Sequence, residues 1–201
     1  MISVEAQENE PLQYISVGLH AGLNIANVSA SPPFNPPTDY RVGFVGGGTV
    51  EIPVRTNVYL TGGLFYVQAG YKFHNQSWGV ESDYFGIPIM AEYKFVTAQR
   101  KFAILLMGGG MPAFKVASAV PMALPTPVLG GGTPSGEYND NIANFDFSLL
   151  AGGGAEIYLD PKLTFRFDSR YAWSLTNAYV PQGLEIKGRN ILITAGLNVN
   201  I

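Results

Sequence analysis

The sequence predicts an all-β protein, an eight-stranded antiparallel up-and-down transmembrane β-barrel. Three observations predict this fold. Apolar and polar residues alternate with a period of two along most of the chain, and no segment has convincing helical spacing. The connections between the predicted strands alternate strictly between short and long. Charged residues make up 13% of the chain, about half of the ~25% that is usual in a soluble protein.

Eight segments show the alternation, and each is long enough for the roughly 9–11 residues with which a tilted strand crosses a bilayer. The last segment shows it best, because Ile191, Ile193 and Leu197 face one way and Leu192 and Thr194 face the other. The predicted strands are 14–28, 41–53, 58–73, 83–96, 101–117, 144–159, 163–175 and 189–201.

The connections predict how the barrel is oriented. The short turns are 53–57, 97–100 and 160–162, and the longer loops are 29–40, 74–82, 118–141 and 176–188. This order puts both chain ends on the short-turn side, which in outer-membrane barrels faces the periplasm. The loop at 118–141 contains four Pro, four Gly and only two charged residues, so we expect it to be extracellular, exposed and the most mobile part of the chain.

The chain divides into a short lead-in and one domain. Residues 1–12 are interpreted as a signal-peptide remnant or a disordered lead-in, because Met1–Ala6 ends in small residues like the tail of a secretory signal peptide. Residues 13–201 form the predicted outer-membrane barrel domain.

The charge count indicates which face of each strand points outward. A soluble barrel needs a well-charged outer face on every strand, but one face of these strands is nearly free of charge and suits lipid. The other face carries a few ionisable groups that can pair inside a narrow barrel. We predict one interior ion-pair network, plugging the barrel, that is made of Glu51, Glu92, Lys94, Glu156, Arg166, Asp168 and Arg170. His20 is predicted to be a further polar residue of the interior.

Three glycine runs lie within predicted strands, at 46–48, 108–110 and 152–154. None is followed by the Lys-Ser/Thr pair of a phosphate-binding loop or opens a helix. We therefore expect these glycines to make room for bulky interior side chains and to allow sharp curvature.

Composition excludes several classes of function. The absence of Cys removes disulfide and thiolate chemistry, and two His make a zinc enzyme improbable. A net charge of −3 provides no basic surface for nucleic acid. No catalytic residue, cofactor or metal site is predicted.

The sequence resembles the PorT-like outer-membrane β-barrel family of Bacteroidota over nearly its whole length. The resemblance rests on the opening strand Ser16–Asn24, on Leu60–Gly70 (LTGGLFYVQAG), on Tyr84–Phe95 (YFGIPIMAEYKF) and on the closing Gly196–Val199. It implies an OmpA-like eight-stranded barrel in the bacterial outer membrane, and some members of the family are linked to secretion. Such barrels commonly end in an aromatic residue, whereas this chain ends in Ile201.

Four hypotheses about function remain open at this stage. The leading one is a non-enzymatic outer-membrane barrel that acts as a structural or protein-interaction module, or as a component of a secretion or surface complex. Its partners would be outer-membrane lipid and proteins bound through the long extracellular loops. The others are a narrow channel for small solutes, a membrane-embedded lipid-modifying enzyme, for which only His20 and His74 could supply a base, and a soluble lipid-carrying barrel.

Overall fold

Strands dominate the computed structural model, which describes residues 14–31, 33, 37–74, 79–97, 101–119, 142–178 and 185–201. The strands are β1 (Ser16–Ser31), β2 (Thr38–Asp39), β3 (Arg41–Arg55), β4 (Val58–Phe73), β5 (Gly79–Gly86), β6 (Ile89–Val96), β7 (Phe102–Ala119), β8 (Phe145–Tyr158), β9 (Leu163–Ser174) and β10 (Glu185–Asn200). No helix in these ranges is long and apolar enough to cross a membrane.

The described strands close into one antiparallel barrel whose wall has eight strand positions, which we call staves. β1 pairs with β10 along its whole length, from Ser16 opposite Asn200 to Ser31 opposite Glu185. Each remaining stave pairs with the next one along the chain. β5 and β6 are two halves of one stave, since both pair with β4 and with β7, and β2 adds only two residues beside β4. The predicted fold class is confirmed.

The fourth stave differs from the predicted continuous strand 83–96. It begins earlier, at Gly79, and it is interrupted at Ile87 and Pro88. Proline has no N–H to give to the ladder, so the regular pairing stops there. The wall nevertheless stays continuous, because Pro88 O accepts a hydrogen bond from Gly63 N (3.1 Å) and Ile87 N donates to Pro112 O (2.9 Å).

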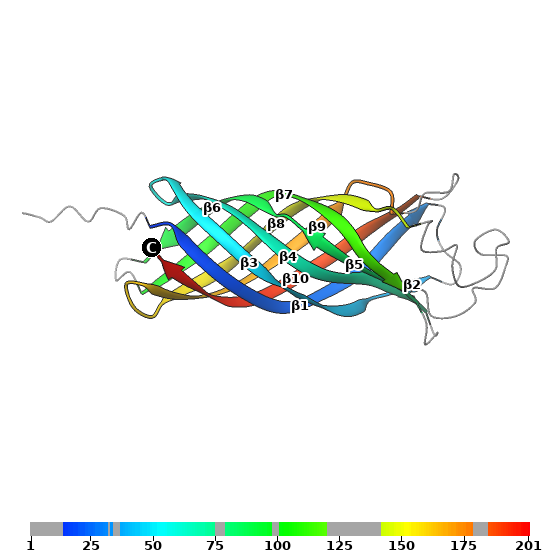
Figure 1. Cartoon of the computed structure of the whole chain (residues 1–201), viewed down its shortest axis with the longest axis horizontal. Helices are drawn as coiled ribbons and strands as arrows, with labels where there is room; N and C mark the ends of the chain where they lie inside the picture. Colours follow the sequence, from blue (N-terminus) through cyan, green and yellow to red (C-terminus); the bar gives the residue numbers. More distant parts are fainter. Residues whose placement is uncertain are drawn as a thin grey trace, which may run out of the picture.

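The two ends of the barrel differ in their connections. The turns β3–β4, β6–β7 and β8–β9 lie at one end, where β1 begins and β10 ends (Figure 1). The β3–β4 turn is the tightest, and Asn57 takes the left-handed backbone conformation that such a turn needs (φ 61°). The longer connections join the strands at the opposite end. Residues 1–12 and 120–141, about which we made predictions from sequence, lie outside the described residues.

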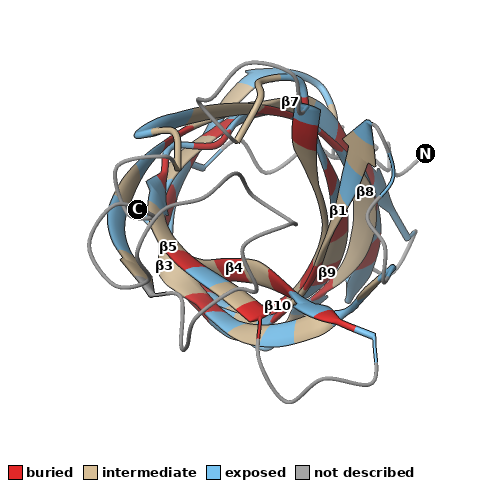
Figure 2. Cartoon of the chain, turned by 90° about the vertical axis from the view of Figure 1, so that its right-hand side faces the viewer, coloured by how far each residue is buried: buried red, intermediate tan, exposed pale blue. Residues whose placement is uncertain are grey.

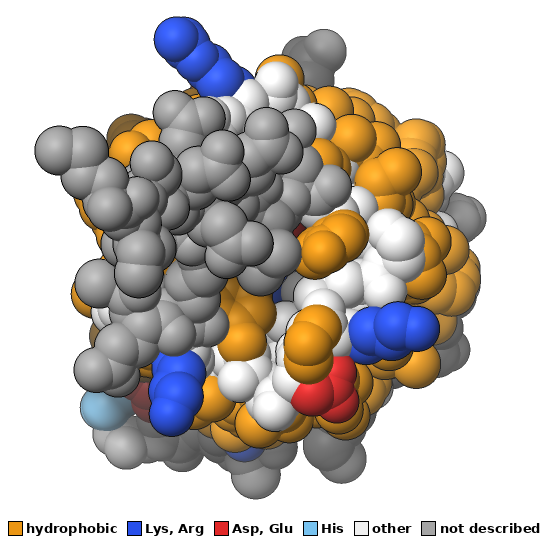
Figure 3. All heavy atoms as spheres, turned by 90° about the vertical axis from the view of Figure 1, so that its left-hand side faces the viewer, with side chains coloured by type: hydrophobic (Ala, Val, Ile, Leu, Met, Phe, Trp, Pro, Cys, Tyr) orange, Lys and Arg blue, Asp and Glu red, His pale blue; other side chains and the backbone are white. Residues whose placement is uncertain are grey.

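The two faces of the wall have opposite character. Buried positions line the inside and exposed positions cover the outside when the barrel is viewed from the long-loop end (Figure 2). In β9, for example, Arg166 and Asp168 are buried, whereas Phe167 and Trp173 are exposed. Hydrophobic side chains cover much of the visible rim of the barrel when it is viewed from the short-turn end (Figure 3). This apolar exterior suits lipid, and the closed ladder leaves no sheet edge that lipid would have to satisfy.

Candidate functional site: the barrel interior

All eight ionisable residues that the sequence assigned to the interior are buried there. None of them is more than 5% exposed. They come from strands far apart in the sequence, because every second residue of each stave points inward. The set is His20 on β1, Glu51 on β3, Glu92 and Lys94 on β6, Glu156 on β8, and Arg166, Asp168 and Arg170 on β9. They gather in the half of the barrel nearer to the short turns.

Arg166 is the centre of this charged layer. Its two terminal nitrogens donate to both oxygens of Glu92, over 2.8 and 2.9 Å. One of these nitrogens also donates to Glu51 Oε2 (3.2 Å), and Nε donates to Asp168 Oδ2 (3.2 Å). The guanidinium therefore joins β9 to β3 and β6 across the lumen, through the paired geometry that gives strong carboxylate contacts.

Lys94 makes a second junction of the same network. Its ammonium contacts Glu51 Oε1 and donates to both oxygens of Glu156, over 2.9 and 3.0 Å. It also lies 4.3 Å from the centre of the Tyr59 ring. Because Glu51 contacts both Lys94 and Arg166, the two cations belong to one connected cluster.

Arg170 extends the network toward the middle of the barrel. Its Nε lies 2.7 Å from Asp168 Oδ1, although the N–H is not aligned for a hydrogen bond. Its Nη2 donates to Thr194 Oγ1 (2.9 Å), and its guanidinium lies 5.1 Å from the centre of the Phe65 ring. Opposite Arg170 on β8 is Gly152, where an added Cβ would lie 2.3 Å from a backbone oxygen and 3.0 Å from Arg170 Cγ. A glycine of the 152–154 run thus leaves space for an interior arginine.

His20 lies in the same layer but forms no ion pair within the described part of the chain. Its Nε2 is 3.0 Å from Thr49 Oγ1. Gly196 on β10 is opposite His20, and a Cβ there would come within 2.6 Å of His20 Nδ1 and 2.2 Å of Leu19 O. The ring therefore fills a space that only glycine leaves open.

The charged layer is suited to holding the wall together, because its charges of opposite sign are matched. Four carboxylates face three permanent cations, and each carboxylate contacts at least one of them. In the described ranges, no group of three or more His, Asp or Glu side chains could hold a metal ion.

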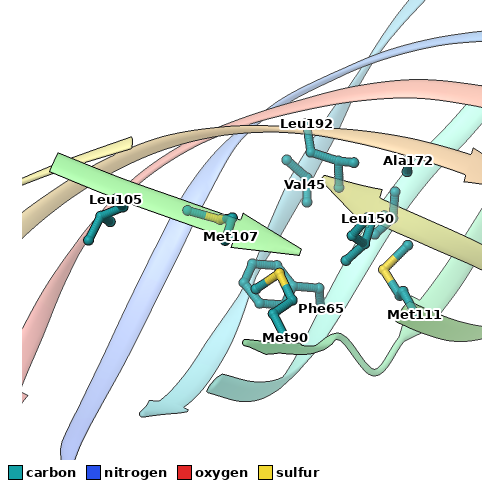
Figure 4. Packing of buried hydrophobic residues seen from close by; sticks show 10 residues of the cluster. Val45, Phe65, Met90, Leu105, Met107, Met111, Leu150, Ala172 and Leu192 are labelled. Carbon is teal, nitrogen blue, oxygen red and sulfur yellow. The ribbon is translucent and has the colours of Figure 1, made fainter. Parts of the chain in front are cut away.

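An apolar cluster fills the middle of the lumen. Met107 connects it to the charged layer, since its sulfur lies 3.8 Å from Arg166 Nη2. The side chains point toward one another from opposite staves (Figure 4). The cluster contains Val45, Phe65, Val67, Met90, Leu105, Met107, Met111, Leu150, Ala172 and Leu192.

A second polar group, which sequence reasoning missed, lies nearer to the long-loop end. Asp146 on β8 accepts hydrogen bonds from the hydroxyls of Ser148 (2.9 Å), Ser174 and Thr176. The available signal was the spacing of Asp146 and Ser148, which puts both on the inner face of one strand. At this end of the barrel, on half-exposed side chains, His74 Nδ1 lies 3.0 Å from Asp39 Oδ2.

Comparison with known proteins gives a consistent classification. The sequence profile of the family described as "Outer membrane protein beta-barrel domain" matches residues 5–180. No curated protein sequence matches the chain.

Solved structures of bacterial outer membrane proteins have a similar fold. Neisserial surface protein A is 17% identical with a TM-score of 0.54, over 93% of this chain and 97% of that one. The outer membrane protein OprG from Pseudomonas aeruginosa is 9% identical with a TM-score of 0.55, over 95% of this chain and 98% of that one. At such identities the similarity shows the fold alone.

Proposed function

We propose a function for this chain, which belongs to the outer membrane protein beta-barrel domain family. It is a non-conducting, non-enzymatic barrel that serves as a structural or protein-interaction module. The barrel lies in the bacterial outer membrane. Its exposed apolar side chains, such as Leu19, Ile89 and Leu149, contact the lipid. In this proposal the membrane-spanning part is an anchor, and the specific activity belongs to what the anchor presents at its surface.

The observation that carries the proposal is that side chains occupy the lumen at two levels. The charged layer around Arg166 and Lys94 lies nearer to the short turns, and the apolar cluster around Phe65 and Leu150 follows it. Eight staves enclose just enough width for side chains to fill. A solute would have to displace paired charges and then a packed apolar layer.

The long connections are the proposed sites of protein interaction. They leave the barrel at one end, and in outer-membrane barrels this is the extracellular end. The test replaces residues 120–141 by a Gly-Ser linker of equal length. We expect the barrel to assemble as before and a chemically crosslinked surface partner to be lost. Protease added to intact cells should cut the wild type within this segment, and cleavage only after outer-membrane rupture would contradict the orientation.

A narrow channel for small solutes is the alternative that the polar interior favours. The buried charges of Glu51, Lys94 and Arg166 could line a water-filled path if the network opened. Liposome swelling in small sugars and amino acids distinguishes the two functions. Swelling faster than that of protein-free liposomes would favour the channel.

A membrane-embedded enzyme is the weakest alternative. His20 contacts a threonine hydroxyl inside the barrel, and His74 forms an exposed pair with Asp39. Replacing each histidine by alanine should leave the rate of lipid hydrolysis equal to that measured with the wild-type protein, because neither is expected to exceed the rate without protein. A loss of hydrolysis on either replacement would support the enzyme.

Within the family, we propose a PorT-like member of the Bacteroidota barrels that works in a secretion or surface complex. The support is the sequence of the motifs Ser16–Asn24, Leu60–Gly70 and Tyr84–Phe95. The prediction is checked by deleting the gene and measuring secreted protein. Unchanged secretion and unchanged surface complexes would reject this assignment.

A further inference from the structure

The lumen contains a cavity of about 100 Å³ on the long-loop side of the apolar cluster. Val67 and Met111 belong both to the cluster and to the wall of the cavity, so the cluster forms its floor. The volume approaches that of engineered apolar cavities of about 150 Å³ that bind benzene. It is therefore suited to a small molecule.

Small side chains create this space. Ala69 on β4 and Ala113 on β7 point into the barrel, and both are buried against the cavity. The neighbouring wall is mostly apolar, with Val80 and Ile186 on opposite sides of the lumen. A larger residue at either alanine would occupy the cavity directly.

Asp146 is the one carboxylate among the described residues that line the cavity, which also include the polar residues Asn27, Ser82, Tyr84 and Asn190. An ionised carboxylate offers about four lone-pair positions, and the hydroxyls of Ser148, Ser174 and Thr176 occupy three of them. Asp146 forms no ion pair with any described residue. It lines the cavity, so the fourth position is the one that a bound molecule would use.

We propose that this cavity binds a small, neutral, apolar molecule with one hydroxyl group, such as a phenol of about the size of benzene, which donates its proton to Asp146. A single hydroxyl matches the fourth acceptor position of Asp146. An ammonium group would also be attracted to the carboxylate, but entry into a mostly apolar cavity would remove most of the water around its charge, which is costly.

The test uses the full chain in lipid nanodiscs, with ¹³C-labelled methionine methyl groups observed by NMR. The Met111 methyl reports on the cavity floor. The probes are p-cresol, toluene, which lacks the hydroxyl, and benzylamine, which carries the ammonium group. Ala113→Phe fills the cavity, and Phe114→Leu is its matched control because Phe114 is the adjacent residue and points outward. Ala69→Leu serves as a second filling variant if Ala113→Phe does not fold.

We expect p-cresol to shift the Met111 signal saturably in the wild type and in Phe114→Leu, and not in the filled variant. Toluene should bind about tenfold more weakly or worse, as loss of a hydrogen bond to a charged group implies. Benzylamine should also bind more weakly than p-cresol, because its charge must leave its hydration shell. Asp146→Asn should remove most of the preference for p-cresol over toluene. A shift that rises linearly and equally in the wild type and the filled variant would show partitioning into lipid and overturn the site. Equal affinity for p-cresol and toluene would overturn the role of Asp146.

Discussion

The two halves of the lumen are built from the same wall but are filled in different ways. Near the short turns, long charged side chains reach across the barrel, as when Arg166 on β9 contacts Glu92 on β6. Near the long loops, the polar contacts stay local, as when Asp146 on β8 meets Ser174 on β9. Two inward alanines in that half leave a cavity.

The difference shows that a narrow barrel can be crossed by charged contacts at one end and contain a cavity at the other. Contacts across the lumen tie together staves that do not touch through their backbones, so they resist any change in the shape of the barrel. Contacts between neighbouring staves only reinforce the existing ladder. Substitutions in the two halves should therefore differ in both size and kind of effect.

The largest effect is expected from Arg166→Ala in the charged half. The change leaves the buried Glu92 carboxylate without an ion-pair partner among the described residues, and Glu51 and Asp168 keep only Lys94 and Arg170. The free energy of unfolding should therefore fall by about 3–5 kcal/mol. Denaturant unfolding in micelles measures it. Lys162→Ala on an exposed turn is the control and should change the value by less than about 0.5 kcal/mol. A loss below about 1 kcal/mol for Arg166→Ala would mean that water penetrates the charged layer and solvates the carboxylate left unpaired.

In the apolar cluster, Leu150→Ala should lower the free energy of unfolding by about 2–4 kcal/mol, because it removes a buried side chain and leaves a cavity. The matched control is Leu149→Ala, on the adjacent residue that faces lipid and is 46% exposed. The same unfolding measurement should show a loss at Leu149 less than half as large. Equal losses would mean that the interior is no better packed than the exterior.

Removing both partners of one charge pair sharpens the comparison further. Arg166→Met combined with Glu92→Leu should be less destabilising than the sum of the single changes by about 1–3 kcal/mol, because the double variant no longer buries an unpaired Glu92 carboxylate. A double-mutant cycle on the unfolding free energies gives this coupling. Strict additivity would show that the two charges do not sense each other.

A smaller effect is expected where the backbone passes His20. Gly196→Ala places a methyl group against His20 and Leu19 O, and should destabilise the barrel by about 1–2 kcal/mol. Gly62→Ala is the matched control, since an added Cβ there meets nothing within 4 Å. The melting temperatures of the two variants, followed by the change in gel mobility on heating, rank their stability. A control variant that melts no higher than Gly196→Ala would contradict the packing argument.

The sequence predicted well which face of its strand a residue occupies, and it predicted poorly which side chains contact one another across the lumen. Strict alternation put Glu51, Lys94 and Arg166 inside, because a residue's face depends only on its position within its own strand. The pairing of Arg166 with Glu92 could not be predicted, since it depends on the relative register of strands on opposite sides of the lumen. The break at Pro88 was visible as a proline inside a strand, but the alternation on both sides of it favoured one continuous segment.

The central claim is that the barrel is closed to solutes, and single-channel recording in planar lipid bilayers tests it most directly. The purified wild type should give no stable conductance steps, because the charged layer and the apolar cluster fill the lumen in series. Stable, porin-sized steps from the wild type would contradict this claim and support the channel.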